Sequence, residues 1–195
     1  MKFFSGFCLA NEQELFSAYL NQSDFTVAGF SYGAIKAFEY AFTCKERIDT
    51  LQLFSPAFFQ DKDAKFKKLQ TLSFSKNSDL YTQNFMQNCA YPSTFDIQTV
   101  FKQGSLEELS ELLHYTCDEA HLQALKERGV NIEELNELLH YTWEEKRLHS
   151  LKERGINIEV YVGESDTIIN SLHVKDFFVP FASVYYLKRV GHILK

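Results

Sequence analysis

A serine at position 31 stands in the pattern Gly29-Phe30-Ser31-Tyr32-Gly33, after an apolar run that begins at Phe25 and before a helical pattern. This order of strand, sharp turn and helix is typical of a nucleophile elbow, where a serine on a strained turn presents its hydroxyl to a ligand. Glycines are expected on both sides of it because the strand and helix backbones pass too close for a β-carbon. The competing interpretation is an ordinary strand-to-helix turn with a capping serine.

A serine hydroxyl becomes a nucleophile when a base takes its proton and a carboxylate orients that base. The chain supplies these groups in the order Ser31, then the acidic loop Gly163-Glu164-Ser165-Asp166, then His192. The loop and the histidine each follow an expected strand, at the carboxyl edge where open α/β sheets bind ligands. We predict Ser31, Asp166 and His192 as the catalytic residues, with Glu164 as the rival acid. The alternative for His192 is a surface histidine on a C-terminal tail.

The tetrahedral intermediate of acyl transfer needs two backbone N–H donors close to its oxyanion. Tyr32 directly follows the nucleophile, and the loop Ser5-Gly6-Phe7 follows the first expected strand. We predict Tyr32 and Phe7 as the oxyanion donors.

The other histidines offer no comparable setting. Four of them fall in charged helical segments, and one follows the acidic loop on an expected helix: His114, His121, His140, His149 and His173. The repeated pair His114 and His140 lacks the further ligands that a metal site requires, so we expect neither a metal nor another cofactor.

These groups need a parallel sheet to bring them together. Strand patterns cover residues 2–4, 25–30, 50–56, 156–163 and 183–187, and helical patterns cover 11–20 and about 31–46. Strands that alternate with helices predict an α/β fold with a mostly parallel sheet of five or six strands. We therefore expect a hydrolase core formed by residues 1–56 and 156–195, with residues 57–155 inserted as a helical cap.

The composition is that of an ordinary globular protein, with 45% hydrophobic and 24% charged residues in 195. A net charge of −6 argues against a nucleic-acid partner. No run approaches the roughly 20 apolar residues of a membrane span, and the N-terminal residues lack a sustained signal-peptide core. The four cysteines show no regular spacing and indicate free thiols. We expect a cytoplasmic protein.

The expected cap contains a duplication. Residues 107–133 and 133–159 are identical at 19 of 27 positions, and the motif Leu-Leu-His-Tyr-Thr begins at both 112 and 138. Two copies are too few for a solenoid, so we interpret them as a lengthened helical hairpin. The end of the second copy leads into the strand at 156–163, whereas the end of the first, at 129–133, is expected to lead into another helix.

Several of these motifs together resemble one family. They are the opening Phe-Phe-Ser-Gly-Phe, Gly-Phe-Ser-x-Gly-Ala-Ile-Lys-Ala at the elbow, Leu-x-Leu-Phe-Ser-Pro, Gly-Ser-Leu-Glu-Glu-Leu before the repeat, the Gly-x-x-Asp loop and the terminal His-x-Leu. In these the chain resembles the BioV-type pimeloyl-acyl-carrier-protein methyl ester esterases, which are α/β-hydrolases. The resemblance covers nearly the whole chain except the extra repeat copy.

The resemblance implies a small α/β-hydrolase that removes the methyl ester from pimeloyl-acyl-carrier protein during pimelate synthesis for biotin. Matched motif by motif, it implies Ser31 as nucleophile, Asp166 as acid and His192 as base. The same triad would serve an acyl thioesterase or a short-chain esterase, and a non-catalytic module that binds acyl-carrier protein is the alternative from another class. No oligomeric state is predicted.

A carrier-protein substrate calls for basic residues near the entrance, because acyl-carrier protein is acidic. Five lysines gather in the first part of the expected cap: Lys62, Lys65, Lys67, Lys68 and Lys76. The alternative interpretation is a solvated helix face. Five aromatic residues of the same region are candidates to line an acyl channel or to form the core of the cap: Phe58, Phe59, Phe66, Phe74 and Phe85.

Overall fold

The computed structural model of the chain describes residues 1–115 and 143–195. Five parallel strands form one sheet in their order along the chain. They are β1 (Lys2–Phe4), β2 (Thr26–Phe30), β3 (Thr50–Phe54), β4 (Asn157–Gly163) and β5 (Ser183–Leu187). The α/β class and the parallel sheet are confirmed, with each strand within two residues of its expected bounds.

The helices of the described residues are η1 (Glu12–Phe16, a 3₁₀ helix), α1 (Tyr32–Thr43), α2 (Ala64–Lys76), α3 (Ser78–Ala90), η2 (Ile97–Val100, a 3₁₀ helix), α4 (Leu106–Leu113), α7 (Glu145–Glu153) and α8 (Ser171–Phe178). The side chains of Asp63, Asn77 and Ser105 accept hydrogen bonds from the first turns of α2, α3 and α4, which fixes where those helices begin. None of the helices described is long and apolar enough to cross a membrane.

The segment expected as a helix over 11–20 forms only the short helix η1. Asn11 has a left-handed backbone conformation, so the helix begins after it. The N–H groups of Tyr19 and Leu20 both donate to the carbonyl oxygen of Phe16. This closes the segment into a turn at Phe16 instead of extending it.

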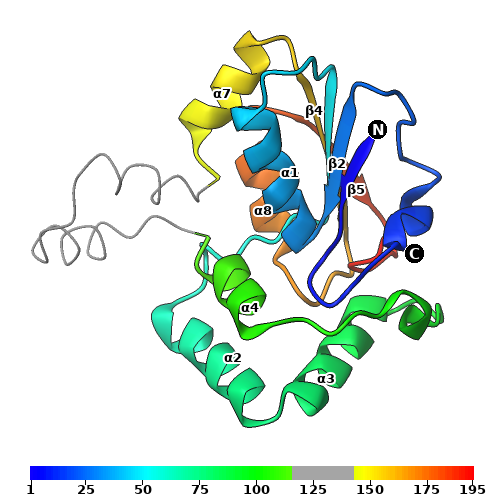
Figure 1. Cartoon of the computed structure of the whole chain (residues 1–195), viewed down its shortest axis with the longest axis vertical. Helices are drawn as coiled ribbons and strands as arrows, with labels where there is room; N and C mark the ends of the chain where they lie inside the picture. Colours follow the sequence, from blue (N-terminus) through cyan, green and yellow to red (C-terminus); the bar gives the residue numbers. More distant parts are fainter. Residues whose placement is uncertain (116–142) are drawn as a thin grey trace, which may run out of the picture.

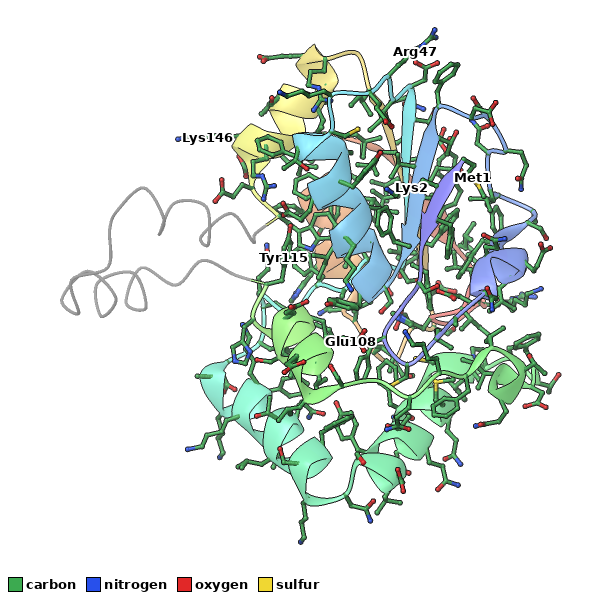
Figure 2. All side chains as sticks on the ribbon, viewed as in Figure 1. Met1, Lys2, Arg47, Glu108, Tyr115 and Lys146 are labelled. Carbon is green, nitrogen blue, oxygen red and sulfur yellow. The ribbon has the colours of Figure 1, made fainter. Side chains whose placement is uncertain are left out.

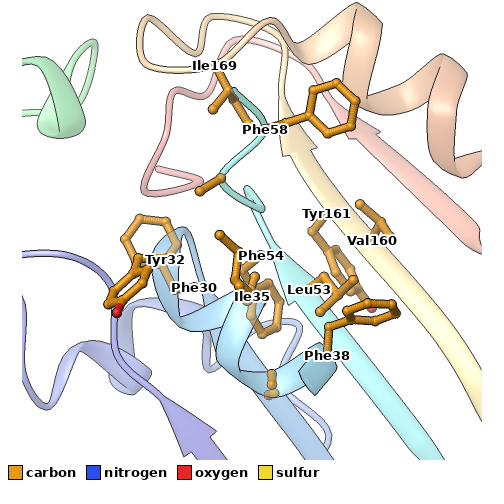
Figure 3. Packing of buried hydrophobic residues seen from close by; sticks show 14 of the residues in the cluster. Phe30, Tyr32, Ile35, Phe38, Leu53, Phe54, Phe58, Val160, Tyr161 and Ile169 are labelled. Atoms are coloured by element: carbon orange, nitrogen blue, oxygen red, sulfur yellow. The ribbon is translucent and has the colours of Figure 1, made fainter. Parts of the chain in front are cut away.

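One face of the sheet is covered by α1, α7 and α8 (Figure 1). Ile35 and Phe38 of α1 lie beside Leu53 of β3 and Val160 of β4 (Figure 3), and all four side chains are buried. Because side chains alternate along a strand, every second residue of β3 and β4 packs on this layer.

The opposite face is covered by η1 over β2 and β3. The ring of Phe16 packs against Phe30 and Phe54, with ring centroids 4.8 and 4.7 Å apart. Farther along the same face, Tyr161 of β4 stacks on Tyr185 of β5 at 4.6 Å. A short helix and aromatic rings therefore form this side of the core.

The helices α2, α3 and α4 lie together beyond the end of the sheet at which α1 begins (Figure 1). By contrast, α7 packs on α1, where Nη1 of Arg147 donates a 2.8 Å hydrogen bond to Glu39. The hydroxyl of Tyr115, which lies beside α1 in Figure 2, donates to the same carboxylate. Within the expected insertion at 57–155, one helix thus belongs to the layer that covers the sheet.

Candidate active site

Ser31 occupies a strained turn between β2 and α1. Its backbone angles are φ 52° and ψ −115°, and its side chain makes no capping hydrogen bond to the helix. A non-glycine residue at positive φ costs free energy and points to a functional constraint. The turn is held by hydrogen bonds from the Ser31 N–H to Phe54 O and from the Ala57 N–H to Ser31 O. These angles argue against an ordinary capping serine.

Two glycines make this turn possible. A β-carbon at Gly29 would lie 2.1 Å from the carbonyl oxygen of Gly33, and a β-carbon at Gly33 would lie 2.0 Å from the carbonyl oxygen of Phe4. Any larger residue would therefore separate α1 from β1 and β2. This is the close approach that the sequence pattern predicts.

Asp166 and His192 meet at the carboxyl ends of β4 and β5. Oδ2 of Asp166 accepts a 2.7 Å hydrogen bond from Nδ1 of His192, and both side chains are fully buried. The other carboxylate oxygen accepts from the N–H groups of Ile168 and Ile169 at 2.8 and 3.1 Å. The rival acid, Glu164, instead accepts from the N–H of Arg189. The geometry therefore selects Asp166 as the partner of His192.

The second ring nitrogen of His192, Nε2, is buried and has no hydrogen-bond partner among the described residues. Because a carboxylate accepts the Nδ1 proton, Nε2 is left with the lone pair that a base needs. The imidazole also packs on Phe30, the residue before Ser31, with ring centroids 5.0 Å apart. His192 is thus a buried group held against the elbow, which argues against a surface histidine on a tail.

Sequence reasoning missed Ser55, which follows β3. Its buried hydroxyl donates a 2.7 Å hydrogen bond to the main-chain oxygen of His192. Its own N–H donates to Tyr161 O, and its φ is 40°. The only available signal was the position of Ser55 at the end of a strand in the motif Leu-Phe-Ser-Pro.

The two expected oxyanion donors lie on adjoining segments. Tyr32 is the first residue of α1, at the positive end of the helix dipole. Phe7 lies in the loop after β1, and the carbonyl oxygen of Ser5 in that loop would be 2.6 Å from a β-carbon at Gly33. The loop therefore lies against the first turn of α1.

A pocket of about 440 Å³ lies between the helices beyond the sheet and the loop that carries Asp166. It is lined by residues of the segment before α2, of α2, α3 and α4, and of the acidic loop: Phe59, Phe66, Leu69, Gln70, Ser73, Tyr81, Asn84, Phe85, Asn88, Leu109, Leu112, Leu113, Thr167 and Ile168. Three of the five candidate channel aromatics, Phe59, Phe66 and Phe85, belong to this wall. Phe85 also contacts the ring of Phe7, at 5.3 Å between centroids.

The other two candidate aromatics pack elsewhere. Phe74 lies against Phe7, with ring centroids 6.1 Å apart, and Phe58 packs on Phe177 of α8 at 5.3 Å. Both are buried. They are therefore core residues and do not belong to the pocket wall.

The five candidate lysines do not share one surface. Lys65, Lys68 and Lys76 are exposed on α2, whereas Lys67 is only 7% exposed. Lys62 lies before α2, and its Nζ is 3.5 Å from Asp61. The expectation of a docking role is corrected for Lys67, because neighbours along a helix point about 100° apart and this side chain turns inward.

Three of the remaining histidines lie in the part of the chain that the structure describes. His114 follows the end of α4, His149 lies on α7, and His173 lies on α8, where its Nδ1 contacts Asp61. His121, His140 and the junction of the two repeats fall outside the described residues. Within the described part of the chain, no group of three or more His, Cys, Asp or Glu side chains is placed to hold a metal ion.

A scan of the sequence against protein-family models found no match, and a search of curated proteins found none. The structure is similar to MenH from S. aureus, with a TM-score of 0.56 and 12% identity over 99% of this chain and 87% of that one. It is also similar to E-2-(acetamidomethylene)succinate hydrolase, with a TM-score of 0.52 and 10% identity over 98% and 84%.

A carboxylesterase structure from the thaumarchaeon Nitrososphaera gargenis gives a TM-score of 0.54 and 15% identity. That match covers 86% of this chain, which spans only 57% of the length of that carboxylesterase. At these identities the similarity concerns the fold. Together with the parallel sheet and the elbow after β2, it identifies the chain as a small protein of the α/β-hydrolase fold.

Proposed function

We propose that this chain is a serine carboxylesterase. The observation that carries the proposal is the buried hydrogen bond between Asp166 and His192, which leaves Nε2 of His192 unpaired beside the strained elbow of Ser31. A serine, a histidine and a carboxylate in this chain order form the catalytic set of many esterases.

In the proposed reaction, His192 Nε2 takes the hydroxyl proton of Ser31 as Oγ attacks the ester carbonyl carbon. The N–H groups of Phe7 and Tyr32 stabilise the oxyanion. His192 then returns the proton to the leaving alcohol, which is methanol for a methyl ester. Water, deprotonated by the same nitrogen, attacks the acyl-enzyme and releases the free acid together with Ser31.

For the substrate we propose the methyl ester of pimeloyl-acyl-carrier protein. The pocket of about 440 Å³ supports an acyl substrate, since eight of its fourteen lining residues are leucine, isoleucine or phenylalanine. Thr167 and Ile168, which directly follow Asp166, form part of its wall. An acyl chain in this pocket would end close to the acidic loop.

The exposed face of α2 supports an acidic protein as the carrier of that chain. Lys65, Lys68 and Lys76 share this face with Leu69 and Leu72, which are 58% and 57% exposed. These positions follow the spacing i, i+3, i+4, i+7 and i+11, and so form one stripe along the helix. Leucines flanked by lysines suit an acidic helix with an apolar seam.

The test is hydrolysis of pimeloyl-acyl-carrier-protein methyl ester, followed by gel shift, for the wild type, Ser31→Ala and Ser183→Ala. Ser183 is exposed at the opposite end of the sheet and serves as the matched control. We expect conversion by the wild type and the control but not by Ser31→Ala. Activity on a p-nitrophenyl ester alone would keep the esterase and reject this substrate, and conversion by Ser31→Ala would reject the mechanism.

A further inference from the structure

Glu12 is a buried carboxyl group that the proposed reaction does not use. It is the first residue of η1, and its side chain is fully buried. Oε1 accepts a 2.7 Å hydrogen bond from the N–H of Gly6, whereas Oε2 is buried without a hydrogen-bond partner among the described residues. No basic side chain of the described residues forms an ion pair with it.

This arrangement is costly for a group that only needs to accept one hydrogen bond. Burial of a carboxylate without a cation is unfavourable, and the oxygen of a neutral amide would also accept the Gly6 N–H. A hydrogen bond to a charged acceptor, however, is shorter and about twice as strong as one between neutral groups. The unfavourable burial of Glu12 therefore indicates that a strong hydrogen bond to the Gly6 N–H is needed, one that fixes the peptide between Ser5 and Gly6.

The next peptide along the chain, between Gly6 and Phe7, carries the N–H group of Phe7 that we expect to bind the oxyanion. The carbonyl oxygen of Gly6 accepts a hydrogen bond from the N–H of Leu9 at 3.2 Å. In a trans peptide the C=O and N–H groups point in opposite directions, so the Phe7 N–H points away from Leu9. Among the described residues this N–H has no acceptor. Gly6 is thus bonded on both sides, which fixes the orientation of the Phe7 N–H.

Gly6 also explains why a clamp is needed. A β-carbon there would lie 2.9 Å from the ring of Phe30, so the close contact with Phe30 favours glycine. Glycine has the greatest backbone freedom of any residue, and an unrestrained peptide after it could rotate. Two hydrogen bonds together remove that freedom: the Gly6 N–H donates to the Glu12 carboxylate before the rotatable bonds of Gly6, and the Gly6 carbonyl oxygen accepts from Leu9 after them.

We propose that Glu12 is a positioning residue that holds the loop 5–7 so that the Phe7 N–H is aimed at the oxyanion. This inference rests on the proposed function, because it assigns Glu12 a part in the same reaction. Glu12 acts through Gly6 and does not touch the substrate. It contributes to the transition state, in which the oxyanion forms, more than to substrate binding.

Kinetics on a p-nitrophenyl ester test the catalytic half of the proposal. We expect Glu12→Ala to lower kcat about 10- to 100-fold, less than or comparable to the loss of a whole oxyanion donor, with KM within about twofold. Glu12→Gln restores part of that rate, because its amide oxygen still accepts from Gly6 but binds more weakly than a charged carboxylate. Glu14→Ala, an exposed change on the same helix, keeps the wild-type rate.

Labelling tests the clamp without activity. Ser5-Gly6 is the only Ser-Gly pair in the chain, so ¹³C′-serine and ¹⁵N-glycine give a single coupled amide signal. We expect that proton far downfield in the wild type, upfield in Glu12→Ala, and unmoved in Glu14→Ala. If Glu12→Ala fails to fold, Glu12→Asp, which withdraws the carboxylate by one methylene, should show the same shift and the same loss of kcat to a smaller degree.

The outcomes separate the two proposals. An active wild type whose kcat is unchanged in Glu12→Ala, or is lowered equally in Glu12→Gln, overturns the role of Glu12 and leaves the esterase intact. A Gly6 amide proton whose chemical shift does not change in Glu12→Ala also overturns the role of Glu12. A wild type inactive on every ester overturns the proposed function, even where the Gly6 signal responds.

Discussion

The hydroxyl of Ser55 donates a 2.7 Å hydrogen bond to the main-chain oxygen of His192. This bond joins the end of β3 to the loop after β5, across β4, and both residues are buried. The imidazole of His192 is therefore oriented twice, through its ring by Asp166 and through its backbone by Ser55. The position of the proposed base depends on both contacts.

Replacing Ser55 by alanine should lower both stability and activity. The substitution leaves a buried carbonyl oxygen unpaired, which costs about 1–3 kcal/mol of the free energy of unfolding. We expect kcat for ester hydrolysis to fall about tenfold, a loss of about 1.4 kcal/mol in transition-state stabilisation. Urea denaturation and steady-state kinetics check the two effects. Ser183→Ala should change neither quantity, and a fully active Ser55→Ala would contradict the positioning of His192 by this bond.

Asp166→Asn should abolish most of the activity, whereas Glu164→Gln should leave it nearly unchanged. An asparagine at 166 can no longer accept the Nδ1–H of His192 with a full charge, and comparable losses in other triads are on the order of 10⁴ in kcat. The side chain of Glu164 instead accepts a hydrogen bond from the backbone N–H of Arg189. Parallel assays of the two variants decide the question, and the reverse order of effects would make Glu164 the acid.

Charge reversal on α2 should weaken the use of a carrier-protein substrate. For Lys65→Glu combined with Lys68→Glu, we expect KM for acyl-carrier protein to rise about tenfold at low salt, with less effect at high salt because salt screens exposed charges. Activity on a p-nitrophenyl ester should stay constant. Lys146→Glu, on α7 and away from α2 (Figure 2), is the matched control. A salt-independent KM would remove α2 from the carrier interface.

Filling the pocket should shorten the acyl chain that the enzyme accepts. Ser73 lines the pocket from α2 and is itself exposed, so Ser73→Phe adds a ring to the pocket without cutting into the core. We expect the rate on p-nitrophenyl octanoate to fall at least tenfold relative to the rate on the acetate. Ser75→Phe, on the same helix but outside the pocket wall, should keep the ratio. An unchanged ratio in Ser73→Phe would mean that the chain binds elsewhere.

The stability of the protein should carry a pH dependence from Glu12. Burial raises the pKa of its carboxyl group above the usual value, and this effect outweighs the N–H groups of Gly6 and Glu12 and the hydroxyl of Ser5, which lower the pKa. A folded-state pKa above the unfolded one stabilises the protein below the unfolded pKa, and that contribution is lost as the pH rises through the folded pKa.

Glutamine at position 12 does not titrate. Relative to the wild type, Glu12→Gln should therefore gain stability as the pH rises from about 4 to 8, near and above the ordinary pKa of glutamate. Denaturation of both proteins across this range measures the difference. For Glu14→Gln, a change at an exposed position, the difference in the free energy of unfolding from the wild type should be nearly independent of pH. If the stability of Glu12→Gln relative to the wild type fell as the pH rises, the result would contradict a raised pKa of Glu12.

The sheet and the elbow were predictable because they follow local rules. Apolar strand segments separated by helices specify a parallel sheet, and glycines at 29 and 33 mark the sharp turn around Ser31. Asp166 and His192 follow their strands directly, so topology alone placed them at one edge of the sheet. Which carboxylate meets the histidine was a matter of three-dimensional geometry, and the sequence left Glu164 open beside Asp166.

What the sequence did not reveal are polar side chains whose role is set by burial. Glu12 stands among polar neighbours that suggest an exposed surface, yet it is fully buried. Ser55 looks like a residue of an ordinary strand end. Lys67 lies among exposed lysines and turns inward. In each case the side chain is buried in the folded chain, and no local spacing in the sequence predicts that burial.

The short helix η1 links two properties that protein engineers usually adjust one at a time. Its first residue, Glu12, holds the loop of the proposed oxyanion donor, and its last residue, Phe16, packs between Phe30 and Phe54 in the core. A substitution at Phe16 chosen for thermostability would also move Glu12 and thereby change the rate. Directed evolution of this protein should therefore meet a trade-off between stability and catalytic rate at this helix. Paired substitutions at its two ends would be needed to improve both.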